Sequence, residues 1–92
     1  MALIWGTDRG EHLARHGVTI AQAEEAMADP ERVVFTPDYK SKSGRSIRTI
    51  GFSRSFGDLL AVFTVQFEGA VYGLTAFRAD KHDRGHYIKG GE

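Results

Sequence analysis

The chain contains no cysteine and only two prolines among its 92 residues. The lack of cysteine excludes disulfide scaffolds, thiol nucleophiles and cysteine-based zinc modules, and it is compatible with a reducing compartment. No apolar run approaches the length of a membrane span, and the first ten residues lack the basic and apolar segments of a signal peptide. We therefore expect a cytoplasmic protein without a membrane anchor, folded as one domain over residues 1–92.

The net charge is zero, yet the charges are unevenly distributed along the chain. Residues 1–38 carry seven acids and three bases, whereas residues 39–92 carry nine bases and five acids. Five bases follow one another with no acid among them: Lys40, Lys42, Arg45, Arg48 and Arg54. Such a stretch attracts a polyanion, although a solvated basic loop accounts for it equally well.

The hydrophobic pattern predicts the element order β-α-α-β-β-β-β-α. The expected elements are an edge strand at 3–5, a helix ended by Gly17, a helix at 20–28, strands at 32–35, 46–53, 59–67 and 70–77, and a helix at 81–87. Thr19 and Gln22 have the spacing of a capping box. Glu68-Gly69 has the composition of a two-residue hairpin turn, and Asp80 can cap the last helix.

Consecutive strands joined by short turns favour an antiparallel meander with helices packed on one face. The expected fold class is α+β, with a small antiparallel sheet, two N-terminal helices and one short C-terminal helix. The apolar residues of 59–67 and 71–77 are expected to form the core rather than a cofactor pocket.

Four motifs occur in this order along the chain: His12-Leu13-Ala14-Arg15-His16-Gly17-Val18-Thr19-Ile20 with its Asp29-Pro30 helix stop, Arg48-Thr49-Ile50-Gly51, Leu60-Ala61-Val62-Phe63-Thr64, and Ala76-Phe77-Arg78-Ala79 followed by Tyr87. Taken together, they resemble the BrnT family of toxins from type II toxin–antitoxin systems, part of the RelE-like group of small ribonucleases. The resemblance covers nearly the whole chain and implies a RelE-like fold. It also implies an RNA substrate and a cognate DNA-binding antitoxin, with a dimer of toxin–antitoxin pairs as a further expectation.

The implied activity is metal-independent cleavage of RNA by its own 2′-hydroxyl, without a cofactor. Arg48 and Arg78 match family positions on predicted strands, and we expect the two guanidinium groups to hold one phosphate between them. The other expected catalytic residues are His16, His86 and Tyr87. The expected RNA-binding residues are Arg15, Lys40, Lys42, Arg45, Arg54 and Lys81. Each also has a structural interpretation, as a surface residue, an ion-pair partner, a helix cap or a core-edge aromatic.

Two other functions stay open at this point. An inactive RelE-like module that binds protein or nucleic acid is favoured by the neutral net charge, by Gly85 in the last helix, and by His12 and Arg15 where the family usually has Asn and Lys.

The pairs His12/His16 and His82/His86 have the i,i+4 spacing that can hold a metal. His12-Leu13 lacks the glutamate that follows the first histidine in zinc proteases, and we expect no metal. His82 is expected to be solvated.

Overall fold

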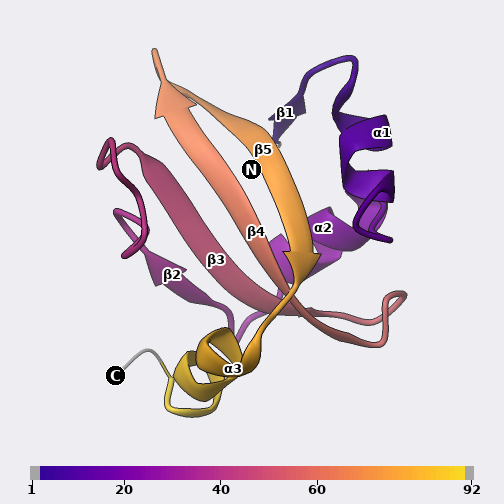
Figure 1. Ribbon diagram of the computed structural model, residues 1–92, viewed down its shortest axis with the longest axis vertical. Helices are drawn as coiled ribbons and strands as arrows, with labels where there is room; N and C mark the ends of the chain where they lie inside the picture. Colours follow the sequence, from indigo (N-terminus) through magenta and orange to yellow (C-terminus); the bar gives the residue numbers. More distant parts are fainter. Residues whose placement is uncertain (1–2, 91–92) are drawn as a thin grey trace.

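The computed structural model describes residues 3–90, which form a five-stranded mixed sheet and three helices (Figure 1). In chain order the elements are β1 (Ile4–Trp5), α1 (Arg9–Ala14), α2 (Ile20–Met27), β2 (Val33–Phe35), β3 (Ser46–Ser53), β4 (Asp58–Phe67), β5 (Ala70–Arg78) and α3 (Lys81–Ile88). This is the predicted α+β class and the predicted order of strands and helices.

Local sequence signals account for several of these boundaries. The Thr19 hydroxyl accepts a hydrogen bond from the Gln22 amide at 3.1 Å, and the Gln22 side chain accepts one from the Thr19 amide at 3.0 Å, as in a capping box. Glu68 and Gly69 both have positive φ, 50° and 80°, as a two-residue turn of type I′ requires. Both predictions are confirmed.

The strands lie in the order β1-β5-β4-β3-β2. Strands β2 to β5 form the predicted antiparallel meander, but β1 pairs with β5 in parallel, so the prediction of a fully antiparallel sheet was wrong. The reason is topological. The chain leaves β1 at one edge of the sheet, passes through α1 and α2, and enters β2 at the opposite edge. The antiparallel meander from β2 to β5 then leads back across the sheet, and its last strand, β5, lies beside β1 and runs in the same direction as β1.

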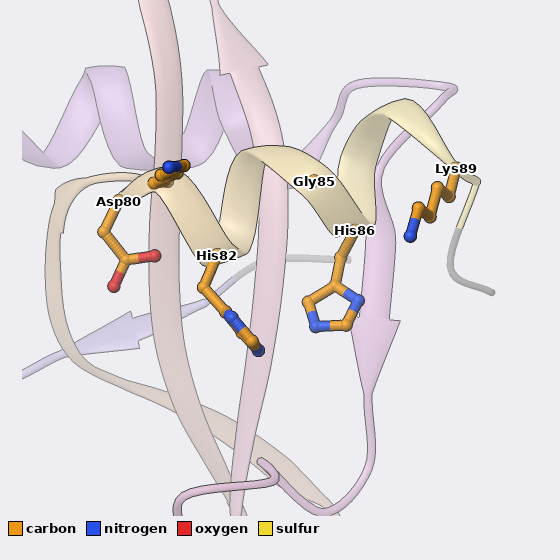
Figure 2. Close-up of a pocket in the computed structure, with 6 residues that line it drawn as sticks. Asp80, His82, Gly85, His86 and Lys89 are labelled. Carbon is orange, nitrogen blue, oxygen red and sulfur yellow. The ribbon is translucent and has the colours of Figure 1, made fainter.

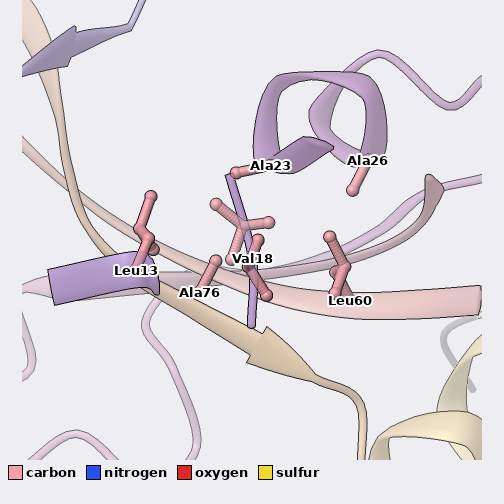
Figure 3. Close-up of a cluster of buried hydrophobic side chains, with 7 residues drawn as sticks. Leu13, Val18, Ala23, Ala26, Leu60 and Ala76 are labelled. Atoms are coloured by element: carbon pink, nitrogen blue, oxygen red, sulfur yellow. The ribbon is translucent and has the colours of Figure 1, made fainter. Parts of the chain in front are cut away.

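One face of the sheet is covered by α1 and α2. Buried residues of the two helices and the loop between them meet β4 and β5 in the main core, which contains Leu13, Val18, Ala23, Ala26, Leu60, Val62 and Ala76 (Figure 3). The approach of α2 to the sheet is close, because a side chain at Gly51 of β3 would overlap the backbone carbonyl of Ala26. Glycine at position 51 is therefore required for α2 to pack against β3 at this distance.

The third helix lies against the other face of the sheet. Tyr87 of α3 packs with Phe35 against a second buried cluster of Ile50, Leu59 and Ala79. The prediction that all helices pack on one face was therefore wrong. The helix α3 occupies only one end of this face, and no other helix within residues 3–90 covers the rest of it (Figure 1). We call this surface the α3 face.

Candidate nucleic-acid interface

The helix α3 is held at its start by a capping box of two aspartates. The Asp80 carboxylate accepts a hydrogen bond from the Asp83 amide at 2.9 Å, and the Asp83 carboxylate accepts one from the Asp80 amide at 3.4 Å. Asp80 was predicted as the cap, and this is confirmed. The helix runs to Ile88, and Gly90 follows it with a φ of 70°. The capping box fixes the residue at which α3 begins.

A buried ion-pair network joins α3 to the sheet. The Arg48 guanidinium donates from Nε to Asp38 Oδ1 at 2.7 Å and from Nη1 to Asp83 Oδ1 at 2.8 Å. The Tyr39 hydroxyl donates to the same oxygen of Asp83 at 2.6 Å. Arg48 is only 4% exposed and Asp83 is fully buried. Burial and the hydrogen bond to Asp83 raise the pKa of Tyr39, which keeps its hydroxyl a donor.

The two arginines expected to share a phosphate lie on opposite faces of the sheet. Arg48 pairs with Phe63 of β4, whereas Arg78 pairs with Leu60, three residues earlier on the same strand. Because successive residues of a strand face opposite sides, Arg48 faces α3, and Arg78 faces the side covered by α1 and α2. The prediction that these guanidinium groups grip one phosphate was therefore wrong. Arg78 is 65% exposed and lies 3.5 Å from Asp58, which also accepts from Arg84 at 2.6 Å.

A row of rings crosses the α3 face, with the Arg48 guanidinium in its middle. The ring row consists of His82, His86, Tyr39, Phe63, Phe77 and His16. On the side of α3, the Tyr39 ring lies 5.8 Å from that of His82 and 5.3 Å from that of His86. The two imidazoles are 5.0 Å apart, and His86 also contacts Phe35 at 4.8 Å.

The ring row continues across the sheet to the end of α1. The Arg48 guanidinium lies 4.5 Å from the Tyr39 ring and 4.6 Å from the Phe63 ring. Phe63 is 5.1 Å from Phe77, and Phe77 is 5.7 Å from His16. His16 was predicted inside the first helix, but the helix ends at Ala14, and His16 is exposed in the turn that follows. The row therefore runs across β3, β4 and β5, from α3 to the α1–α2 turn.

The histidines of α3 line a shallow groove of about 570 Å³. The lining residues are Asp80, Lys81, His82, Gly85, His86 and Lys89. Figure 2 shows the side chains of His82 and His86 extending from the same side of α3, with Lys89 at the end of the helix. His82 is exposed, as predicted, and His86 is half-buried. Gly85 leaves the middle of this groove free of a side chain, which gives a ligand access to both imidazoles.

Two of the expected RNA-binding bases adjoin members of the ring row in the chain, Lys40 beside Tyr39 and Arg15 beside His16. Lys40, Lys42 and Arg45 are exposed in the loop between β2 and β3, and Arg15 is exposed beside His16 at the other end. Lys81 lines the α3 groove. Arg54 is also exposed, but it lies in the turn that Ser53 and Ser55 fasten to Glu25 of α2. The structure thus separates Arg54 from the other expected RNA-binding residues.

Tyr87 has its hydroxyl engaged away from the groove. It donates to Asp29 Oδ2 at 2.6 Å, and the same oxygen accepts from the Phe52 amide at 2.8 Å. The hydrogen bond to Asp29, together with burial, raises the pKa of Tyr87 to about 12. Its ring packs against the second core cluster. Tyr87 therefore fastens α3 to the end of α2, and its hydroxyl is not directed to the groove where a catalytic role was expected.

This bond makes stability depend on pH in the alkaline range. The folded state holds the Tyr87 proton more tightly than the unfolded chain, whose tyrosine pKa is 10.0. The contribution is complete below pH 10 and is lost as the pH rises to about 12. We expect the stability difference between the wild type and Tyr87→Phe to shrink over this interval in urea titrations. A stability difference that stays constant over this pH interval would contradict a contribution from the Tyr87–Asp29 hydrogen bond.

Thr75 carries a buried polar atom on the α3 face. It pairs with Phe63, and its Oγ1 has no hydrogen-bond partner within the described residues. A buried hydroxyl without a partner is costly. We therefore expect Thr75→Val, which keeps the shape, to raise the free energy of unfolding by about 1 kcal/mol. Denaturant titration measures this change, and Thr64→Val, at a buried position on the opposite face, is the comparison. A loss of stability in Thr75→Val would refute the expectation.

Several residues of this surface were missed in the sequence. Asp38, Tyr39 and Asp83 were not considered as parts of the site, although Asp83 stands at the N3 position of a helix capped by Asp80, where a capping box is detectable. Phe63 is buried, which confirms its prediction as a core residue, but its contact with Arg48 depends on strand register. Within residues 3–90, no three His, Cys, Asp or Glu side chains gather as metal ligands. His12 and His16 contact each other, with ring centres 5.6 Å apart.

Comparison with known proteins adds no relative. No family model matches the chain, and no curated protein matches it either. No helix in the described part of the chain is both long and apolar enough to cross a membrane. The fold and the interface therefore define a class only, an α+β domain whose mixed sheet has one face partly free of helices and crossed by aromatic and basic side chains.

Proposed function

We propose that the chain binds single-stranded RNA across the α3 face and cleaves it without a metal, with His82 and His86 as the acid–base pair. The observation that carries the proposal is the ring row. Its rings succeed one another at centre-to-centre distances of 5.0 to 5.8 Å, interrupted only by the Arg48 guanidinium. Phe63 is buried, at 8% exposed, so the rings wholly or partly open to a ligand are those of His82, His86, Tyr39, Phe77 and His16. Unpaired bases stack on such rings, and each stacked base contributes about 1–3 kcal/mol.

The charges around the ring row support a polyanionic ligand. Lys40 follows Tyr39 of the row and shares the exposed β2–β3 loop with Lys42 and Arg45, and Arg15 precedes His16 at the other end of the row. Lys81 and Lys89 line the groove of α3. Among the acids of residues 1–38, Glu11, Glu24 and Glu25 lie on α1 and α2, which cover the other face, whereas Asp38 on the α3 face is paired with Arg48. A neutral protein therefore offers a locally basic surface, and its attraction for RNA falls as salt rises.

The two imidazoles of the groove supply the groups that RNA cleavage needs. One takes the proton of the 2′-hydroxyl as its oxygen forms a bond to phosphorus. The other gives a proton to the 5′-oxygen as the bond between that oxygen and phosphorus breaks. The products are a 2′,3′-cyclic phosphate and a free 5′-hydroxyl. Positioned acid–base groups of this kind contribute about 10²–10⁴ in rate, and Lys81 or Lys89 is near enough to offset phosphate charge.

The toxin role rests on the resemblance to the BrnT family and on the RelE-like relationship that it implies. On that basis, we propose that the protein acts in the cytoplasm and that a cognate DNA-binding antitoxin neutralises it. An RNA-cleaving domain made alone would harm its host, which is why such a partner is needed. Expression of the chain with and without the neighbouring gene, scored for growth and RNA integrity, tests this part.

A second candidate function is RNA binding without cleavage. It is favoured by the state of Arg48, whose guanidinium is held by two carboxylates at the centre of the ring row, so that its charge is already paired and is not available to stabilise the charge on phosphorus. Binding with no cleavage products at any pH would select this candidate.

Fluorescence anisotropy with a short fluorescein-labelled oligouridine tests the binding surface. We expect Phe77→Leu, which removes one ring of the row but keeps an apolar side chain, to weaken binding by about 1–3 kcal/mol. Phe56→Leu is the matched control, because Phe56 packs against the main core on the side of α1 and α2 and lies outside the row. We expect this control to bind as the wild type does. Absence of binding by the wild type, or equal loss in both variants, would overturn the proposal.

A further inference from the structure

We propose that Asp83 is the positioning residue of the RNA-binding surface, fixing the histidines of α3 and the Tyr39 ring in one arrangement. The RNA ligand in this inference rests on the proposed function, whereas the effect of Asp83 on the positions of the rings does not. Asp83 is fully buried and is the only carboxylate within residues 3–90 whose hydrogen bonds reach the sheet, the β2–β3 loop and α3 together.

The contacts of Asp83 define this role. Its Oδ1 accepts from Arg48 on β3 and from the Tyr39 hydroxyl in the loop, and its Oδ2 accepts from the backbone of Asp80 at the start of α3. His82 precedes Asp83 in the helix, and His86 lies three residues beyond it. A movement of Asp83 therefore changes where both imidazoles stand relative to the Tyr39 ring that they contact.

Asp38 provides a matched comparison within the same network. It accepts from Arg48 at 2.7 Å, as Asp83 does at 2.8 Å, and it is 7% exposed. Its other hydrogen bond is from the Lys40 amide in its own loop, and none of its hydrogen bonds reaches α3. Asp38→Asn and Asp83→Asn each remove one ion pair of Arg48, but only the second removes a contact that holds α3.

Proton and carbon NMR of the histidine rings tests the structural part. In the wild type and Asp38→Asn, we expect the His82 and His86 rings to show nuclear Overhauser contacts with the Tyr39 ring. In Asp83→Asn these contacts are expected to weaken or vanish while the contact between Phe63 and Phe77 remains. If Asp83→Asn does not fold, Tyr39→Phe replaces it, because this variant keeps the ring and the Arg48–Asp83 pair. In Tyr39→Phe we expect an intermediate loss of the contacts between the histidine rings and the ring at position 39. Unchanged contacts in Asp83→Asn, or unchanged contacts in Tyr39→Phe where Asp83→Asn is unfolded, would overturn the inference.

Oligouridine binding tests the functional part. We expect the dissociation constant to rise about tenfold or more in Asp83→Asn, since misplacement of positioned groups is costly. The change in Asp38→Asn should be much smaller, although both variants lose stability. Equal weakening in the two would mean that Asp83 acts only through stability. If the wild type binds no RNA while the NMR contacts respond as stated, the proposed function fails and the positioning role of Asp83 stands.

Discussion

Replacement of Arg48 by alanine is expected to lower the free energy of unfolding by about 3–5 kcal/mol. The cause is the environment of the two carboxylates that remain. Asp38 is 7% exposed and Asp83 is fully buried, and each loses its charged partner in the variant. A domain of this size has only about 5–15 kcal/mol of stability, so the loss takes a large share of it. The Tyr39 and Phe63 rings also lose the guanidinium that packs against both.

Urea titration monitored by circular dichroism measures this loss, with Arg78→Ala as the matched control. Arg78 is 65% exposed, and its ion pair with Asp58 is long, at 3.5 Å. An exposed pair contributes at most about 1 kcal/mol, so the control should stay near the wild type. Equal effects of the two substitutions would contradict the role of Arg48 as a structural anchor.

Replacement of both groove histidines by glutamine is expected to lower RNA cleavage by about 10²–10⁴, because glutamine hydrogen-bonds but does not transfer protons at neutral pH. Affinity for RNA should also fall, because two rings of the row are lost and each contributes about 1–3 kcal/mol, so the cleavage rates are compared at saturating RNA. Gel analysis of a labelled RNA measures the rate, and anisotropy measures the affinity. The result would separate the chemical step from binding.

The matched control is His12→Gln, which alters the other i,i+4 histidine pair, far from the α3 groove in the chain and absent from its lining. This control should cleave at the wild-type rate. Cleavage by the wild type should also persist in excess chelator, which separates the imidazole mechanism from a metal-dependent one. Full activity in the double variant, or its loss with chelator, would refute the assignment of His82 and His86.

The sequence allowed the order of strands and helices to be predicted because the decisive signals are local. The capping box of Thr19 and Gln22 and the turn at Glu68-Gly69 each depend on residues no more than three apart. The strand at Ser46–Ser53 was predicted with the bounds that the structure shows. These features follow from backbone preferences that hold in most tertiary contexts.

The site could not be predicted in the same way, because it depends on register and on distant partners. Arg48 meets Asp38 and Asp83, ten and 35 residues away in the chain. The face on which Arg48 and Arg78 lie depends on strand pairing, where a shift of one residue reverses every side chain. The strand β5 also has an irregularity in its pairing with β4 near Phe63 and Thr64. No local pattern signals that α3 crosses to the face opposite α1 and α2.

The most direct test of the RNA interface is an NMR titration of the isotope-labelled protein with a short single-stranded RNA. The account predicts that the shifted signals map to the α3 face, with His82, His86, Tyr39 and Phe77 among the most affected, and that those of α1 and α2 stay in place. Shifts confined to the face covered by α1 and α2, or no shifts at all, would contradict it.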